Sequence, residues 1–460
     1  MADQATAQEF DMLVLGGGSG GYAAALRGVQ LGLTVGLIEK SKLGGTCLHN
    51  GCIPTKALLH SAEVADHARD GAKYGVNVEL QSIDMTAVNA YKDGIIAGKY
   101  KGLQGLIKGK GITVIEGEGR LTSQDTITVN GTEYKGKNIV LATGSYSRSL
   151  PGLEIGGKVI TSDQALTMDY VPKSVIVLGG GVIGVEFASV WKSFGVDVTI
   201  IEGLPSLVPN EDASIIKVLE RTFKKRGIKF NTGTFFQGVE QNENGVKATL
   251  VDGKTFEADL MLVAVGRGPS TAGLGFEEAG VTIDRGFVIT NERLHTGVGN
   301  IYAVGDIVPG VQLAHRGFQQ GIFVAEEIAG QNPVVVEDIN VPKVTFCDPE
   351  IASVGYSEKA AKEKFGDENV ESTEYNLAGN GKSAILGTGG IIKFVREKNG
   401  PVVGVHMIGT RVGEQIGEAQ LIVNWEAYPE DVASLIHAHP TQNEALGEAA
   451  MALAGRPLHG

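Results

Sequence analysis

The first apolar run of the chain, residues 11–15, leads into a glycine-rich turn and then into small and apolar residues that reach Leu31. A short apolar run predicts a buried strand, and the stretch that follows is typical of a helix packed on a sheet. Gly32 ends the predicted helix, and a second apolar run over 33–38 leads to Glu39. The pattern predicts a β-α-β unit.

The turn between the first strand and the helix carries Gly16, Gly18 and Gly21 in GxGxxG spacing. In such a turn the first glycine allows a tight bend, and the second lets backbone N–H groups approach a pyrophosphate at the positive end of the helix. Glu39, at the end of the second strand, can accept hydrogen bonds from a ribose. These features predict a dinucleotide site.

The whole unit recurs. Gly16, Gly32 and Glu39 have the counterparts Gly179, Gly195 and Glu202, each 163 residues further along, and the glycine spacing repeats at 179, 181 and 184. The second unit has predicted strands over 174–178 and 196–201 and a predicted helix over 185–194. A carboxylate at the end of the second strand repels a 2′-phosphate, so the nicotinamide partner is expected to be NAD rather than NADP.

Each unit is closed by a buried run that ends in glycine, over 138–144 and 260–266, and a similar run over 300–306 ends in an acid, Asp306. After Pro342, apolar and polar residues alternate over 344–346, 391–395 and 402–408, which is typical of strands. The apolar residues over 414–426 recur with the period of a helix. We therefore expect an α/β fold with two Rossmann-like dinucleotide-binding domains, one inserted in the other, and a C-terminal α+β domain. The predicted divisions are 1–150, 151–270, 271–341 (completing the first domain) and 342–460.

Cys47 and Cys52 follow the first unit directly. Pro54 fits the first turn of a helix, which places Cys52 near a helix N-terminus with Lys56 one turn on, and both features favour a thiolate. We considered a zinc site with His49, a structural disulfide and two unrelated buried thiols, and we favour a redox-active pair. Cys347 has no partner in the sequence pattern and is expected to be a small buried residue.

A candidate base lies near the C-terminus. His439 has a pKa range suited to proton transfer, and Glu444 could orient it. Thr441 and Glu444 also form a capping-box pattern, so Glu444 could serve only to bond a backbone N–H. The sequence leaves both interpretations open.

Composition narrows the class of protein. The 460 residues carry a net charge of −13, which argues against binding to nucleic acid. We find neither an apolar run of membrane-spanning length nor a signal-peptide pattern, so no membrane association is expected. Three cysteines in this length suit a reducing, cytoplasmic setting rather than a disulfide-stapled secreted protein.

Together these elements resemble the FAD-dependent pyridine nucleotide–disulfide oxidoreductases over essentially the whole chain. The motifs that carry the resemblance are GGGSGG (16–21), GGTCLHNGCIPTK (44–56), GGGVIGVE (179–186) and HAHPT (437–441), with ATGS, AVGRGP, YAVGD and LAHRG. Within the family they look most like the enzymes that reoxidise protein-bound dihydrolipoamide. His49 inside the redox loop and Phe346-Cys347-Asp348 depart from the usual pattern.

The resemblance implies tightly bound FAD, and NAD as the second cofactor. It assigns FAD to Gly16, Gly18, Gly21, Glu39, Thr46, Lys56, Gly119, Thr143, Gly144, Ser145, Asp306, Leu313, Ala314 and His315. It assigns NAD to Gly179, Gly181, Val182, Ile183, Gly184, Glu186, Glu202 and Gly266. No metal is implied.

The resemblance also divides the chemistry among residues. Cys47 would exchange with the dithiol substrate, Cys52 would face the flavin, and Lys56 would pair with Glu186 near it. His439, held by Glu444, would reach the cysteine pair of the other subunit, which implies a homodimer joined through the C-terminal domain. Electrons would pass from the cysteines to FAD and then as hydride to NAD.

The implied partner is a lipoyl-bearing acyltransferase of a 2-oxo acid dehydrogenase complex or a glycine-cleavage lipoyl carrier. Two alternatives stay open: a related NAD(P)H-dependent disulfide reductase, and a flavoprotein binding component without disulfide turnover. Glutathione-type reductases usually carry arginines after the second unit, whereas Glu202 is followed here by Gly-Leu-Pro-Ser.

Overall fold

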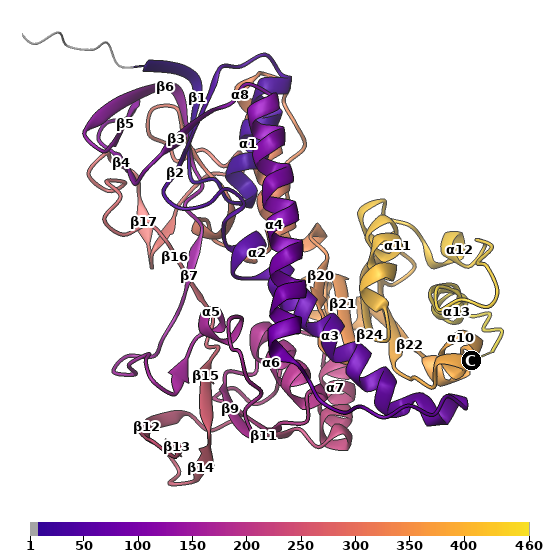
Figure 1. Ribbon diagram of the computed structural model, residues 1–460. Helices are drawn as coiled ribbons and strands as arrows, with labels where there is room; N and C mark the ends of the chain where they lie inside the picture. The colour runs from indigo at the N-terminus through magenta and orange to yellow at the C-terminus, as the bar shows by residue number, and fades with distance from the viewer. Residues whose placement is uncertain (1–7, 460) are drawn as a thin grey trace, which may run out of the picture. The chain divides into compact units, whose positions relative to one another are not determined.

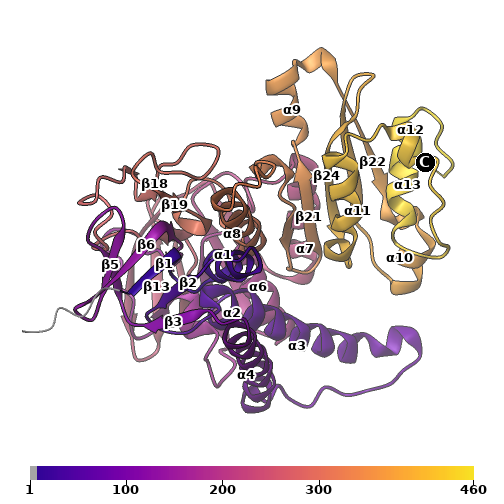
Figure 2. The same ribbon diagram turned by 90° about the horizontal axis from the view of Figure 1, so that it is seen from above.

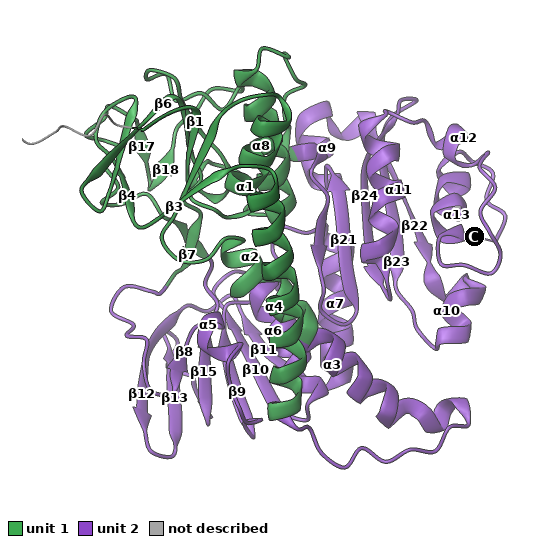
Figure 3. Cartoon of the chain, turned by 45° about the horizontal axis from the view of Figure 1, so that its top comes forward, with its two compact units in different colours: residues 1–57, 86–148, 267–338 green, residues 58–85, 149–266, 339–460 purple. Residues whose placement is uncertain are grey.

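The structure, a computed structural model, describes residues 8–459 and divides into two compact units (Figure 3). Unit 1 takes in the chain up to residue 57 together with 86–148 and 267–338. Unit 2 takes in 58–85, 149–266 and the chain from 339 onward. Each unit is assembled from separated stretches of sequence, as expected when one domain is inserted in another.

Unit 1 is built on a seven-stranded sheet. Its strands run in the order β3 (Thr113–Glu116), β2 (Val35–Glu39), β1 (Gln8–Leu15), β6 (Thr132–Leu141), β5 (Thr126–Val129) and β4 (Gly119–Leu121), with β19 (Ile301–Ala303) also paired to β6. The β3-β2-β1-β6 pairs and the β6-β19 pair are parallel, and β4-β5-β6 are antiparallel. The late strand β19 therefore completes the sheet that β1 begins.

Helices α1 (Ser19–Gln30) and α8 (Ala314–Ile328) lie side by side in unit 1 (Figure 1). Their backbones approach so closely that a Cβ at Gly321 would stand 2.1 Å from the carbonyl oxygen of Gly20. Only glycine fits there. The unit also contains α2 (Gly45–His49), the long α4 (Met85–Gly109), the two-stranded pairs β7 (Ser145–Ser147) with β16 (Arg267–Pro269) and β17 (Ile283–Asp284) with β18 (Phe287–Val288), and the 3-10 turn η2 (Gly305–Ile307).

Unit 2 contains a second parallel sheet. Its strands run in the order β11 (Lys229–Thr232), β10 (Asp197–Glu202), β9 (Ser174–Leu178), β15 (Leu260–Val263) and β8 (Val159–Ile160). Helices α5 (Ser162–Ala165), α6 (Val182–Ser193) and α7 (Ala213–Arg226) accompany it, and an antiparallel sheet of β12 (Phe236–Asn242), β13 (Gly245–Leu250) and β14 (Thr255–Ala258) adjoins it. Helix α3 (Cys52–Asp70) begins in unit 1 and ends in unit 2.

The C-terminal part of unit 2 is an antiparallel sheet with helices over it (Figure 2). The strand order is β20 (Lys343–Thr345), β21 (Glu350–Gly355), β24 (Val402–Gly409), β23 (Ile391–Glu397) and β22 (Val370–Asn376). The helices are α9 (Glu358–Phe365), α10 (Gly381–Leu386), α11 (Val412–Asn424), α12 (Pro429–Val432) and α13 (Glu444–Leu453). Four short 3-10 turns complete unit 2: η1 (Gly71–Tyr74), η3 (Asp338–Asn340, which starts at the unit boundary), η4 (Asp367–Asn369) and η5 (Leu377–Gly379).

The two faces of this C-terminal sheet differ in chemistry. Its apolar face packs on α11 and α13 through Val354, Phe394 and Met407. The other face carries a polar row in strand register, which runs through Lys343, Ser353, His406, Lys393 and Glu374. Such alternation is the period-2 pattern of strands.

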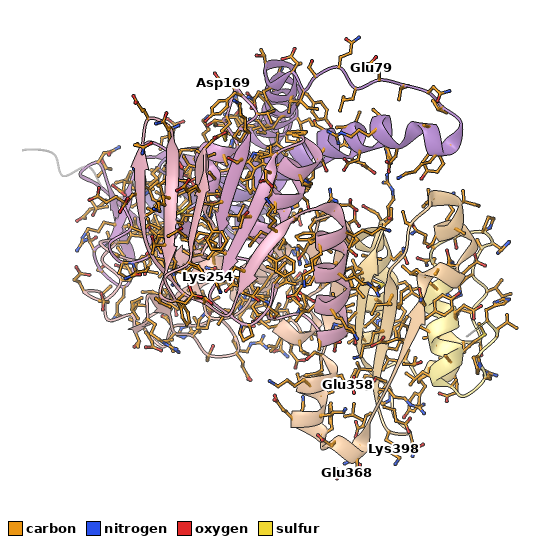
Figure 4. All side chains as sticks on the ribbon, turned by 90° about the horizontal axis from the view of Figure 1, so that it is seen from below. Glu79, Asp169, Lys254, Glu358, Glu368 and Lys398 are labelled. Carbon is orange, nitrogen blue, oxygen red and sulfur yellow. The ribbon has the colours of Figure 1, made fainter. Side chains whose placement is uncertain are left out.

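The buried centre of the polar row is an ion cluster. Lys393 is 4% exposed, and its Nζ lies 3.0 Å from Asp212 Oδ1 and 2.7 Å from Glu358 Oε2. Glu358, labelled in Figure 4, is the first residue of α9, and Asp212 caps α7 by accepting from the Ser214 amide. The cluster therefore fixes α7 and α9 on this face of the sheet.

The predicted fold class is confirmed, and the predicted strand over 174–178 matches β9 at both ends. The predicted runs 138–144 and 260–266 were wrong at their ends, because β6 stops at Leu141 and β15 at Val263. Gly144 and Gly266 lie beyond the strands with φ of 74° and 108°, a left-handed backbone that does not continue a ladder. The three predicted domain boundaries, after residues 150, 270 and 341, stay a prediction. No helix of the described residues is both long and apolar enough to span a bilayer.

Candidate functional site

The two cysteines lie on consecutive helices, and both residues belong to unit 1. Cys47 is inside α2, and Cys52 is the first residue of the 19-residue helix α3. Both thiols are half-buried. The Thr55 amide donates to the Gly51 carbonyl, and the Asn50 amide to the Thr46 carbonyl, so the intervening loop is fixed at both ends. Pro54 lies in the first turn of α3, as predicted.

The two thiols interact directly. A hydrogen bond with Cys52, followed by burial and by charge on Cys52, raises the pKa of Cys47, while the Lys56 ammonium opposes that rise. The pKa of Cys47 therefore lies well above its usual value, and the positive end of the α3 dipole favours an anion at Cys52. Burial and the two nearby thiols raise the pKa of Tyr22 to about 12, so this phenol lies close to the pair and stays protonated.

The first glycine turn has the geometry that a pyrophosphate needs. Gly16 has a φ of 106°, and a Cβ at Gly21 would stand 1.8 Å from the Gly16 carbonyl oxygen. Gly18 caps α1 with no side-chain hydrogen bond, and a Cβ there would meet nothing closer than 3.9 Å. No side chain therefore caps the first N–H groups of α1, which is the arrangement that an anion at a helix N-terminus needs.

The second glycine turn has nearly the same backbone conformation as the first. Gly179 has a φ of 112°, and a Cβ at Gly184 would stand 1.9 Å from the carbonyl oxygen of Gly179. Gly181 caps α6 with φ −76° and ψ −172°, against −74° and −171° at Gly18. Val182 and Ile183 form the start of α6, and Val182 is exposed. The sequence repeat is thus a repeat of backbone conformation.

The two acids at the strand ends also match. Glu39 accepts from the Gly17 amide at 2.7 Å and the Ser41 amide at 2.8 Å. Glu202 accepts from the Gly180 amide at 2.6 Å and the Leu204 amide at 2.8 Å. Each carboxylate is therefore fixed beside its glycine turn, and ribose hydroxyls could still donate to its remaining lone pairs.

A polar chain lies beyond the ends of β6 and β19. Ser145 Oγ donates to Asp306 Oδ2 at 2.6 Å, and Thr143 Oγ1 donates to the Ser270 carbonyl at 2.6 Å. Arg267 Nε donates to Ser145 Oγ at 2.8 Å. Arg267 also reaches Thr46 at 3.5 Å, the residue before Cys47. Arg267 lies in the AVGRGP motif but was not predicted as a site residue, whereas its neighbour Gly266 was.

The remaining predicted residues of unit 1 differ in exposure: some lie at the start of a helix, and one is closely packed in the sheet. Leu313, Ala314 and His315 form the N-terminus of α8, where His315 is exposed. Gly119 begins β4, where a Cβ would stand 2.5 Å from a methyl of Leu15. Close packing is therefore a sufficient reason for glycine at 119.

His439 lies in unit 2 at the edge of α13. Its Nδ1 donates to Glu444 Oε1 at 2.8 Å, which leaves Nε2 as the basic nitrogen, and 77% of its side chain is exposed. The other carboxylate oxygen of Glu444 accepts from the Thr441 amide at 2.7 Å. Glu444 therefore makes both hydrogen bonds, the one to His439 and the one to a backbone N–H. The predicted cap at Thr441 was misplaced, because α13 begins at Glu444 itself.

Burial raises the pKa of Glu444, but the Thr441 amide and His439 more than offset that rise, so the pKa lies below its usual value. Glu444 therefore stays ionised beside the histidine at neutral pH. Glu186 is 3% exposed on α6, and its Oε1 accepts from the Phe346 amide at 2.9 Å. Cys347 is buried as expected, with its thiol 3.2 Å from the Pro349 carbonyl oxygen.

The residues present fit two dinucleotides. Both helix N-termini lack a side-chain cap, and a Cβ at Gly18 or Gly181 would meet no atom closer than 3.9 Å. A Cβ added at Gly144 or Gly305, at the ends of β6 and β19, would have no neighbour within 4 Å. Unit 1 brings the first turn, Asp306 and both cysteines together, and unit 2 holds the second turn and His439. The assigned roles of the individual residues remain predictions.

A reactive thiol pair beside one of two dinucleotide folds defines a disulfide oxidoreductase. Residues 10–321 match the model of the pyridine nucleotide-disulphide oxidoreductases, and residues 341–450 match the dimerisation domain of the same group. The chain belongs to the pyridine nucleotide-disulphide oxidoreductase family. It is an enzyme of that family with FAD and NAD as cofactors, and its dimerisation domain supports a homodimer.

Named relatives cover almost the full length. The chain is 41% identical to "Dihydrolipoyl dehydrogenase" of Bacillus subtilis, covering 98% of this chain and 100% of the relative. It is 40% identical to "Dihydrolipoyl dehydrogenase, mitochondrial" of Pisum sativum, covering 98% and 93%. The crystal structure of LpdA from Mycobacterium tuberculosis superposes with a TM-score of 0.90 at 26% identity, covering 97% of this chain and 99% of LpdA.

Proposed function

We propose that this chain reoxidises protein-bound dihydrolipoamide to lipoamide and passes the electrons to NAD⁺, the reaction of a dihydrolipoyl dehydrogenase. The observation that carries the proposal is the Cys47–Cys52 pair, in which one thiol begins a long helix and hydrogen-bonds the other. Relatives of that name at about 40% identity over the full chain support the choice of substrate.

Cys47, Cys52 and His439 can together carry out a thiol–disulfide exchange with the substrate. A substrate thiolate attacks Cys47 Sγ of the Cys47–Cys52 disulfide, Cys52 leaves as a thiolate, and His439 Nε2 takes the substrate's proton. The second substrate sulfur then displaces Cys47 from the mixed disulfide and closes the lipoyl ring. The substrate loses two electrons and two protons: one proton rests on His439 Nε2, the other passes to Cys47, and Cys52 stays a thiolate. Bound FAD supplies the acceptor through which the two electrons reach NAD⁺ as hydride.

A groove in unit 1 fits an aliphatic substrate arm. It has a volume of 470 Å³ and lies along α1 and α8, with an open and mostly apolar lining of Tyr22, Ala23, Leu26, Arg27, Gln30, Phe318, Ile322 and Glu326. Arg27 pairs with Glu326 at 2.7 Å, so its charge is already neutralised. Tyr22, one of the lining residues, lies near the thiols, whose charge raises its pKa. A lipoyl chain suits this lining better than glutathione, which carries several charges.

The exposure of His439 supports a role in a dimer. Its Nδ1 is held by Glu444, but three-quarters of its side chain is open in a single chain. We propose that the homodimer brings His439 of each subunit to the cysteine pair of its partner. A lipoyl-bearing acyltransferase or a glycine-cleavage lipoyl carrier then presents the substrate in trans, in the cytoplasm.

An anaerobic titration with NADH tests the proposal against a flavoprotein that binds without disulfide turnover. The two-electron-reduced enzyme is expected to show a long-wavelength band from a Cys52 thiolate next to the flavin. Cys52→Ser should lack the band, whereas Cys347→Ser, the matched control, should keep it. If the wild-type protein takes up two electrons without the band, the non-catalytic alternative is favoured.

A further inference from the structure

The segment that carries His439 is irregular, and one residue holds it on both sides. Residues 436–443 form neither helix nor strand. Glu418 of α11 accepts from His437 Nε2 with Oε1 at 2.8 Å and from Asn443 Nδ2 with Oε2. His437 precedes His439 by two residues, and Asn443 follows it by four. A single carboxylate therefore bridges the two ends of the segment.

The contacts of Glu418 are largely shielded from water. The Glu418 side chain is 24% exposed, and that of His437 is 11% exposed. The His437 ring packs on Gly447 of α13, where a Cβ would stand 2.7 Å from Nδ1. His437 is therefore fixed between α11 and α13, and charge-assisted hydrogen bonds at such a site are stronger than exposed ones.

The middle of the segment is held independently. Asn380, which is 4% exposed, donates from Nδ2 to the Thr441 carbonyl at 2.9 Å. Thr441 Oγ1 donates to the Ala438 carbonyl at 2.7 Å. With its ends tied to Glu418 and its centre to Asn380, the segment can present the exposed His439 ring in one orientation.

We infer that Glu418 is a positioning residue for the proton transfer at His439. This inference rests on the proposed function, in which His439 is the base. Glu418 lies on a different helix from Glu444 and does not touch His439, so it acts through His437, Asn443 and the backbone between them. Removing its carboxylate frees both ends of the segment and leaves the Glu444–His439 hydrogen bond able to move with it.

The test separates two activities of the holoenzyme dimer. Oxidation of dihydrolipoamide by NAD⁺ needs the base, whereas reduction of ferricyanide by NADH does not. Glu418→Ala should lower kcat for dihydrolipoamide about tenfold to a hundredfold, the effect of a misplaced catalytic group. Its ferricyanide activity should stay near wild type. Glu418→Gln, which can accept only one of the two hydrogen bonds well, should lie between. Glu414→Ala, a change on the same helix outside these contacts, should match wild type in both assays.

A double mutant makes the inference falsifiable even if Glu418→Ala is less stable. In a His439→Ala background, Glu418→Ala should change dihydrolipoamide turnover by no more than about twofold, because the group it positions is absent. Equal losses in the two assays, or a full additional loss in the His439→Ala background, would overturn the inference. A wild-type enzyme that does not oxidise dihydrolipoamide would instead overturn the proposed function.

Discussion

His439 and Glu444 share a 2.8 Å hydrogen bond from Nδ1 to a carboxylate oxygen whose twin accepts the Thr441 amide. Glu444 thus fixes the ring and the backbone in front of it at once. Because Nδ1 is occupied, Nε2 is the nitrogen that can accept a proton. In the proposed function, this pair on an exposed edge of unit 2 serves as the base and the acid that orients it.

His439→Ala is expected to slow dihydrolipoamide oxidation about 10²–10⁴-fold, the usual contribution of general acid–base catalysis. Glu444→Gln should have a smaller effect, because the amide can still bond either His439 or the Thr441 amide. Steady-state kcat against pH measures both. A loss below tenfold in His439→Ala would show that this histidine is not the base.

The cysteine pair gives the second prediction. Cys47→Ser should abolish dihydrolipoamide oxidation yet retain NADH-dependent ferricyanide reduction, since the electron path from NADH to the flavin does not pass through Cys47. Cys347→Ser is the control, because Cys347 is buried elsewhere, against Pro349. If Cys47→Ser still oxidised dihydrolipoamide, the proposal that the substrate exchanges at Cys47 would be contradicted.

Glu39 and Glu202 occupy equivalent positions in the two repeated β-α-β units, so the same substitution can be compared at both sites. Glu202→Gln should weaken NAD⁺ binding and narrow the preference for NAD⁺ over NADP⁺, because the repelling charge is removed while one backbone hydrogen bond can persist. Glu39→Gln, the same change in the same geometry, should weaken FAD retention and leave the nucleotide preference unchanged. Titration of each nucleotide and release of flavin during dialysis measure the two effects. Identical phenotypes would contradict separate sites.

The buried ion cluster predicts a pH dependence of stability. Lys362 and then Lys393 lower the pKa of Glu358 from 4.5 to about 2, so this carboxylate stabilises the fold above pH 4.5 and progressively less as the pH falls toward 2. Lys393→Met removes the positive charge that pairs with the carboxylates of Asp212 and Glu358, and it should lower the free energy of unfolding by about 3–5 kcal/mol at pH 7. The difference in melting temperature from wild type should shrink between pH 4.5 and 3.

Lys359→Met on the same helix as Glu358 is the control, because Lys359 is 87% exposed and makes only a 3.8 Å pair with Glu363. It should melt like wild type at every pH. A Lys393→Met penalty that did not change with pH would mean that packing, rather than charge, accounts for it.

The sequence predicted what depends on local backbone geometry. Gly16 and Gly179 must adopt positive φ, and Gly21 and Gly184 must pass within contact of the preceding turn, so the spacing alone marked both nucleotide folds. It did not predict α4, because Gly94, Gly98, Gly102 and Gly105 lie inside that helix and each lowers helix propensity.

Residues whose partners are distant in the sequence were also beyond prediction. Arg267 meets Ser145 across 122 residues, and Glu418 meets His437 across 19. No spacing rule joins such pairs, because the fold alone brings β16 to β7 and α11 to the segment before α13. Glu444 is a different case, because its two partners lie only three and five residues away. The sequence allowed either role, and the folded chain shows that Glu444 makes both hydrogen bonds.

The most direct test of the account is a steady-state comparison of two substrate pairs on the wild-type dimer. Dihydrolipoamide with NAD⁺ should be turned over efficiently, and glutathione disulfide with NADPH poorly, because the groove at Tyr22 is mostly apolar and Glu202 disfavours a 2′-phosphate. A kcat/KM that strongly favoured glutathione disulfide and NADPH would contradict the proposed reaction.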